Sequence, residues 1–283
     1  MRRLTPYLLA LPSWMWLGIF LVVPMAAMAS VSLQTGNAID GFAMTFSFSN
    51  YTDALSRYSP QLLRSLLYGG LATVAMLVIG YPVAYWIAFK GGARKSMYLF
   101  LLLLPFFVSF VLRTISWGFL LADDGVLFGP LKSWGVLPAG FHVLATTFAV
   151  VGGLTYNFLP FMILPIYVAL ERVDPRVIEA AYDLYASRTA AFRRVVLPLS
   201  LPGVFAGVLM TFVPATADPV NAQILGGTSN TMIGNIIQTQ YLTNLDYPTA
   251  SALSFTLMAV LLVGIFIYAK ALGTENVLEA AAR

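Results

Sequence analysis

The sequence predicts an all-α membrane protein with six transmembrane helices. Of its 283 residues, 59% are apolar and only 10% are charged, whereas soluble domains carry about 25% charged residues. The mean hydropathy is +0.81. Six apolar stretches reach the about 20 residues that a helix needs to cross the hydrocarbon core, and they do not alternate in polarity as the strands of a membrane barrel would. They lie near residues 7–33, 62–89, 97–121, 143–170, 195–217 and 248–271.

The first stretch imitates a secretory signal, since a basic start and an apolar run precede Ala27-Met28-Ala29. Its apolar core is longer than the about 7 to 15 residues of a signal, so we expect it to remain as the first span.

Basic residues set the expected orientation, because positively charged loops stay on the cytoplasmic side. If the N-terminus is inside, only Arg57, Arg64 and Lys132 fall in outer loops. With six spans, both termini are then expected in the cytoplasm of a bacterial cell. The net charge of +4 follows from this bias, so we do not interpret it as a nucleic-acid signal. The inner basic residues are Arg2, Arg3, Lys90, Arg94, Lys95, Arg172, Arg176, Arg188, Arg193, Arg194, Lys270 and Arg283.

The loops indicate one domain over residues 1–283, since no linker, internal repeat or low-complexity segment interrupts the chain. In the first outer loop, Phe46 and Phe48 alternate with serines. This pattern predicts a short extended piece, followed by a helix capped by Asn50 or Thr52. The absence of cysteine excludes disulfides, thiol catalysis and thiolate metal sites.

The inner segment 171–194 is unusually long and charged for a loop of so apolar a chain. Its pattern predicts an amphipathic helix over 175–192, with Asp174 as N-cap and Pro175 at the first helical position. Such a helix can lie on lipid or dock onto a soluble protein. Acidic residues intervene among the basic ones, which favours a protein partner. The expected apolar face consists of Val177, Ala181, Leu184, Tyr185 and Phe192.

Residues 179–198 resemble the EAA motif of permease subunits of bacterial ABC importers. The motif reads EAA, three residues, Gly, nine residues, Ile or Val, one residue, Leu-Pro. This sequence has Glu179-Ala180-Ala181, Val195 and Leu197-Pro198 at these spacings, with Tyr185 in the glycine place. The resemblance implies a type I importer permease whose cytoplasmic coupling helix docks onto an ATPase subunit. Tyr185 suggests either a more continuous helix or an aromatic contact with that subunit. The coupling residues implied are Glu179, Ala180, Ala181, Asp183, Leu184, Tyr185, Ala186 and Arg188.

Resemblance extends over most of the chain. SNYTDAL (49–55), RTISW (113–117) and the long stretch 214–254 are similar to the spermidine/putrescine subfamily, and to the first permease of its pair. This implies polyamine uptake, a second related permease, an ATPase dimer that binds ATP and Mg, and an extracytoplasmic binding protein. The chain itself has no GxxxxGK[ST] loop, so the resemblance implies no enzyme, no catalytic residue and no cofactor in this subunit.

Other functions stay open. Related importers carry iron, phosphonates or other small solutes on a similar scaffold. A secondary transporter would need buried carboxylates or broken helices at the midplane of both halves. An intramembrane enzyme would need a metal or nucleophile constellation, and one histidine, His142, does not supply it.

Several polar and aromatic residues are candidates for the substrate pathway. Asp218 with Asn221 and Gln223 could attract an ammonium group, or could simply begin a loop. Trp117 and Tyr156 could add cation–π attraction. Asn157 could line the pathway or join helices. Arg113 lies within a span, where a charge indicates either a pathway or an ion pair, although snorkelling to the headgroups is an alternative.

Overall fold

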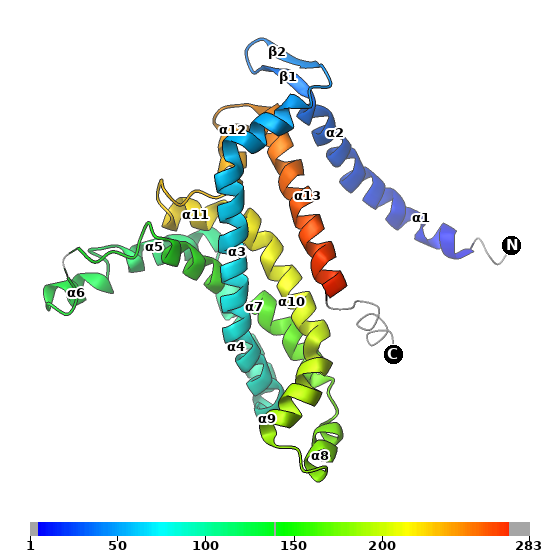
Figure 1. Cartoon of the computed structure of the whole chain (residues 1–283), viewed down its shortest axis with the longest axis vertical. Helices are drawn as coiled ribbons and strands as arrows, with labels where there is room; N and C mark the ends of the chain where they lie inside the picture. Colours follow the sequence, from blue (N-terminus) through cyan, green and yellow to red (C-terminus); the bar gives the residue numbers. More distant parts are fainter. Residues whose placement is uncertain (1–4, 139, 272–283) are drawn as a thin grey trace. The chain divides into compact units, whose positions relative to one another are not determined.

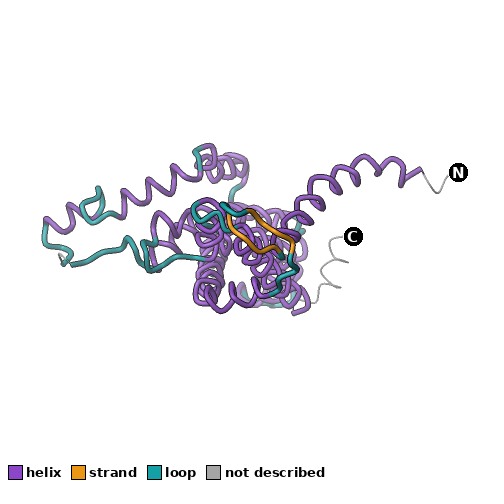
Figure 2. The backbone as a smooth tube through the Cα atoms, turned by 90° about the horizontal axis from the view of Figure 1, so that it is seen from above, coloured by secondary structure: helices purple, strands orange, loops and turns teal. Residues whose placement is uncertain are grey.

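The computed structural model describes residues 5–138 and 140–271. Nearly all of this part of the chain is helical (Figure 1), and one short hairpin forms its sheet (Figure 2). The chain divides into two compact units: Met1–Pro60 with Ile236–Val260, and Gln61–Asn235 with Leu261–Arg283. Arg2, Arg3 and Arg283, which contribute to the expected orientation, lie outside the described residues.

The first unit begins with a helix that contains one wide turn. Helix α1 (Thr5–Leu17) and helix α2 (Val23–Ser32) are joined by a π-helical segment, Gly18–Val22, after which the N–H of Val23 bonds back to the carbonyl of Gly18. Pro24 follows at once, and proline lacks the N–H that would close the next regular turn. The wide turn accommodates that proline without ending the span.

After α2 the chain forms an antiparallel hairpin of β1 (Gln34–Asn37) and β2 (Gly41–Met44). The side-chain amide of Asn37 donates to Asp40 at 2.8 Å, and its carbonyl oxygen accepts from the backbone of residues 39 and 40. The predicted extended piece therefore lies earlier than the Phe46–Ser49 alternation indicated. Helix α3 (Ser49–Lys90) already begins at Ser49, so the prediction of Asn50 or Thr52 as its cap is wrong.

Asn50 instead ties the start of α3 to the hairpin, because its amide donates to the carbonyls of Ser32 and Gln34. The first unit also contains most of helix α12 (Ile233–Leu242) and the first part of helix α13 (Tyr247–Ala271).

The second unit is built around two long helices that lie side by side, α7 (Thr147–Glu171) and α10 (Leu197–Ala217) (Figure 1). Their close approach depends on Gly203. A Cβ at this position would lie 2.5 Å from both the Cβ of Ala169 and the carbonyl oxygen of Pro165. The unit also contains residues 61–90 of α3 and the last part of α13. Its shorter helices include α4 (Lys95–Leu103), α5 (Phe110–Leu121), α6 (Phe128–Ser133), α8 (Pro175–Asp183), α9 (Arg188–Ala191) and α11 (Val220–Leu225).

The all-α, multi-span prediction is confirmed. Five helices are long and apolar enough to cross a membrane, and a bent helix pair makes a sixth span if its two parts count together. That pair is the predicted span at 97–121. It consists of Gly92–Phe107 and Phe110–Leu121, which meet at 86°. Pro105 ends regular hydrogen bonding in the first part, and Val108 is extended. The third predicted span is therefore two helices joined at a sharp bend, which is the geometry of a broken span or of a re-entrant loop.

Candidate functional site

The EAA stretch folds as helix α8, a turn, and the short helix α9 that leads into α10. The predicted start of α8 is confirmed, since the Asp174 carboxylate accepts from the backbone N–H of Arg176 at 2.9 Å and Pro175 occupies the first turn. Ser187 caps α9 in the same way through the N–H of Ala190. Two short capped helices thus replace the single helix predicted over 175–192.

Tyr185 makes the turn between them. Its φ of 59° lies in the left-handed region, where a helix commonly ends on glycine. The N–H of Ala186 bonds to the carbonyl of Ala181 at 3.0 Å, and the N–H of Tyr185 bonds to that of Tyr182. This pattern satisfies carbonyls at the end of α8 as a Schellman turn does. The expectation of a more continuous helix is therefore wrong, because the backbone keeps the glycine-type turn with a tyrosine in it.

The turn also exposes its largest apolar side chains. Tyr185 is 98% exposed and Leu184 is 82% exposed. Val177, within α8, is exposed as well. The predicted apolar face is therefore wrong at these three positions. Ile178, which the pattern did not select, packs with Phe192 against the core instead.

The remaining coupling residues lie on the same surface. Glu179 is exposed and has no hydrogen bond or ion pair within the described part of the chain. Beside the turn lies a hollow of about 470 Å³. The sequence did not predict this hollow, although the two adjacent arginines that line it, Arg193 and Arg194, could have indicated a polar site. Ala180, Asp183 and Arg188 are exposed, and Ala181 and Ala186 are half-buried. The hollow is lined by Ser187, Thr189, Ala190, Arg193 and Arg194.

Four of the polar residues in the second unit form one buried hydrogen-bonded network. The Asn157 amide donates to the Thr114 hydroxyl and to the Asn221 side-chain oxygen, both at 3.0 Å. Asn221 in turn donates to Asp218. The network joins α5, α7 and α11, so Asn157 links helices. Its own side-chain oxygen is buried and has no partner among the described residues.

Asp218 lies directly after α10 and holds the start of α11. Its Oδ2 accepts from the backbone N–H of Asn221 at 2.7 Å and from the Asn221 side chain at 2.9 Å. Burial raises the pKa of this carboxyl above its ordinary value, and the bonds from Asn221 oppose that rise. Asp218 stands one residue before Pro219, the N-cap position of α11. A short polar side chain that accepts from a nearby backbone N–H is a local feature that the sequence can indicate.

Three of the pathway candidates lie outside this network. Gln223 is exposed on α11. Trp117 and Tyr156 are half-buried and form an edge-to-face pair with ring centroids 5.3 Å apart. The structure thus brings Asn157, Asp218 and Asn221 together, sets an aromatic pair apart from them, and leaves Gln223 unpaired with either.

Arg113 makes no ion pair with any residue that the structure describes. It is only 8% exposed, which is incompatible with snorkelling, and its Nε and Nη1 atoms have no hydrogen-bond partner there. Its guanidinium carbon lies 4.6 Å from the ring centroid of Phe106, and 5.8 Å and 5.9 Å from those of Phe110 and Tyr156. The charge is therefore enclosed by aromatic faces.

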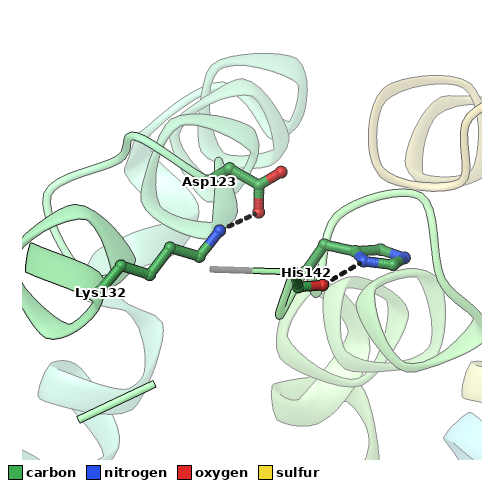
Figure 3. A network of polar contacts seen from close by, with 4 residues as sticks. Asp123, Lys132 and His142 are labelled. Atoms are coloured by element: carbon green, nitrogen blue, oxygen red, sulfur yellow. Dashed lines mark hydrogen bonds and ion pairs between the residues drawn. The ribbon is translucent and has the colours of Figure 1, made fainter. Parts of the chain in front are cut away.

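His142 lies in a loop without a catalytic arrangement (Figure 3). Its Nδ1 is 3.2 Å from the carbonyl oxygen of Gly140, while Lys132 and Asp123 pair with each other at 2.9 Å. Within the described ranges, no group of three or more His, Cys, Asp or Glu side chains could hold a metal ion.

Five helices of membrane-spanning length and a bent apolar helix pair define a multi-pass membrane protein. The chain belongs to the family of binding-protein-dependent transport system inner membrane components, whose model matches residues 76–271. It is thus a multi-pass inner membrane protein of a transport system and not an enzyme.

Among curated relatives, the chain is 36% identical over 257 residues to the spermidine/putrescine transport system permease protein PotB of Haemophilus influenzae, covering 90% of each chain. Among solved structures, it is similar to a chain of a bacterial ABC transporter involved in the import of the acidic polysaccharide alginate, with a TM-score of 0.76, 18% identity and 96% of each chain covered. A bacterial alginate ABC transporter bound to a periplasmic protein gives a TM-score of 0.71 at 19% identity, with 94% and 93% covered. The two structures support the fold.

Proposed function

We propose that this chain is the transmembrane permease subunit of an ATP-binding-cassette importer that moves polyamines of the spermidine and putrescine class inward. One observation carries the proposal: the EAA stretch forms an exposed, capped helix and turn whose residues have the spacing of a coupling motif. The 36% identity to a spermidine/putrescine permease over 90% of both chains supports the substrate class. The chain acts as one transmembrane domain, with both termini in the cytoplasm.

Coupling works through the surface of α8 and its turn. An ATPase dimer, which binds ATP and Mg, docks beneath this subunit and a second related permease. Glu179 and the exposed Leu184 and Tyr185 contact the ATPase. The remaining EAA residues, Ala180, Ala181, Asp183, Ala186 and Arg188, shape and flank the same surface. Since α9 continues through a π-helical segment into α10, a displacement of the turn moves a membrane span directly.

The solute passes the second unit near its half-buried aromatic pair. Trp117 and Tyr156 present π-faces that attract ammonium groups. Asp218 supplies the negative charge, Asn157 and Asn221 hold its network in place, and Gln223 offers an exposed amide. An extracytoplasmic binding protein delivers the solute to this side.

The experiment is purification of the tagged subunit from its native membrane with whatever co-purifies. A second permease and an ATPase are expected, with ATP hydrolysis stimulated by spermidine or putrescine together with the binding protein. If the ATPase is present but only another solute, such as iron or a phosphonate, stimulates it, the substrate class is wrong and the importer class stands. Absence of any ATPase contradicts the coupling proposal.

Glu179→Arg tests the docking surface. This reversal is expected to reduce both ATPase co-purification and stimulated hydrolysis, because it places a cation where the partner meets a carboxylate. Asp124→Arg is the matched control, since Asp124 is also an exposed carboxylate but lies in the predicted outer loop. Equal behaviour of the two variants would remove the proposed role of Glu179.

A further inference from the structure

Arg113 carries a permanent positive charge that nothing in the described chain neutralises. Arginine stays protonated at all physiological pH values. Its side chain is nine-tenths buried, and both Nε and Nη1 lack a hydrogen-bond partner among the residues described. The faces of Phe106, Phe110 and Tyr156 offset part of the lost hydration. They accept no ordinary hydrogen bond, so the donors remain unsatisfied.

The guanidinium lies at the start of helix α5, where the third span is broken. Arg113 is in the first turn of this 12-residue helix, and its rings of contact, Phe106 and Phe110, flank the break. The first backbone bond of the helix runs from the N–H of Arg113 to the carbonyl of Ser109, and the Ser109 side chain does not cap the helix. The earlier N–H groups of the first turn have no intrahelical acceptor, and the helix dipole adds positive potential there.

The described carboxylates of the second unit are either engaged elsewhere or exposed. Asp123 pairs with Lys132, Glu171 pairs with Lys95, and Asp218 accepts from Asn221. The other described carboxylates of this unit are Asp124, Asp174, Glu179 and Asp183, all exposed. A site that has only donors and positive charge, inside a membrane span, fits a ligand that has only acceptors and negative charge.

We propose that Arg113 and the first turn of α5 form a binding site for an oxyanion, that is, a carboxylate or phosphate group. The group comes either from a small anion in solution or from the headgroup of an anionic phospholipid. Planar guanidinium donors match both groups in geometry, and backbone N–H groups at a helix start bind the same anions. The site goes beyond the proposed function, since it requires neither polyamine nor ATPase. It also removes an obstacle, because a bound oxyanion neutralises a charge that repels a polycation.

The test uses the complex purified from its membrane in a neutral detergent, before and after exhaustive delipidation. Isothermal titration with inorganic phosphate and with acetate follows the dissolved anion. Native mass spectrometry follows retained phosphatidylglycerol. Three variants are compared with the parent: Arg113→Gln, which loses the charge and leaves a shorter polar side chain; Arg113→Lys, which keeps the charge with fewer donors; and Arg57→Gln. Arg57 is the matched control, because it also lies over an aromatic ring, that of Tyr58 at 5.5 Å, but is exposed.

One saturable site per chain is expected in the parent and in Arg57→Gln. Arg113→Gln should weaken it by about tenfold to a hundredfold, which is the usual effect of losing a hydrogen bond to a charged group, with Arg113→Lys in between. If phospholipid is the source, the parent retains phosphatidylglycerol that Arg113→Gln loses, and phosphate binds only after delipidation. If a dissolved anion is the source, phosphate or acetate binds without delipidation. The proposal is overturned if the parent neither binds an anion nor retains this lipid, whatever the folding of the variants, or if Arg113→Gln binds as the parent does.

Discussion

Tyr185→Gly is expected to stabilise the turn of the EAA stretch. Tyr185 holds a φ of 59°, and an L-residue in the left-handed region costs about 1–2 kcal/mol. Glycine relieves that strain but adds about 0.4–1 kcal/mol of conformational entropy to the unfolded chain. Since the ring is 98% exposed, its removal sacrifices almost no packing. The net gain is about 1 kcal/mol in the free energy of opening the turn.

Hydrogen exchange measures this gain locally. The N–H of Ala186 bonds to the carbonyl of Ala181 only while the turn is closed. A gain of about 1 kcal/mol should slow exchange of this amide about fivefold. Tyr185→Ala removes the ring but keeps the strain, so it should leave the rate nearly unchanged.

Tyr182→Gly is the matched control, because it replaces a tyrosine by glycine within the regular part of α8. Glycine in a helix interior should lower the free energy of opening by about 1 kcal/mol and therefore speed hydrogen exchange. If Tyr185→Gly also speeds exchange, or if Tyr185→Ala protects as well as glycine does, strain at Tyr185 is not the cause. If both Tyr185 variants then lose stimulated ATP hydrolysis, the ring contributes to docking independently of the strain.

Two further changes probe the second unit. Gly203→Ala should destabilise the protein by about 1–3 kcal/mol, because its Cβ meets Ala169 and Pro165. Gly264→Ala is the control, since its Cβ meets open space, and it should be neutral or stabilising by up to about 1 kcal/mol. Thermal unfolding in detergent compares the two variants, and equal melting temperatures would contradict the close approach of α7 and α10. Asn157→Leu should lower the free energy of unfolding by about 1–2 kcal/mol. Interhelical hydrogen bonds in membranes contribute about 0.6 kcal/mol each, and Asn221 and Thr114 each lose a buried partner. An unchanged melting temperature would mean that Asn157 does not join the helices.

Hydrophobic length made the number of spans readable from the sequence, because the membrane imposes it on every helix. The break in the third span was not readable in the same way. Pro105 was visible, but prolines at 160, 165, 202 and 214 lie inside helices that continue. Neighbouring helices decide which prolines interrupt a span. The 86° bend thus depends on packing, and the composition of the span does not predict it.

The candidate residues likewise divide into those whose role depends on adjacent residues, which the sequence predicts, and those whose partners lie far along the chain, which it does not. The N-cap at Asp174 was predictable because a cap depends on a few adjacent residues. The partners of Asn157 come from positions 43 and 64 residues away, and no local pattern reports them. The hairpin at 34–44 was missed because its turn chemistry, an Asn37–Asp40 pair, stands in a loop with no alternating strands to announce it.

Tyr185 and Arg113 are the two places where local rules are broken most clearly. A tyrosine occupies a glycine conformation, and a guanidinium lies buried without an acceptor in the described chain. Strain and unmet donors are costs that a chain tolerates where something outside it compensates. Tyr185 lies on the exposed turn, and Arg113 lies in the first turn of α5 beside the bend of the third predicted span. The two proposals assign them separate contacts, one with a protein at the turn and one with an oxyanion at α5, and the variants above distinguish the two because each changes only one of these positions.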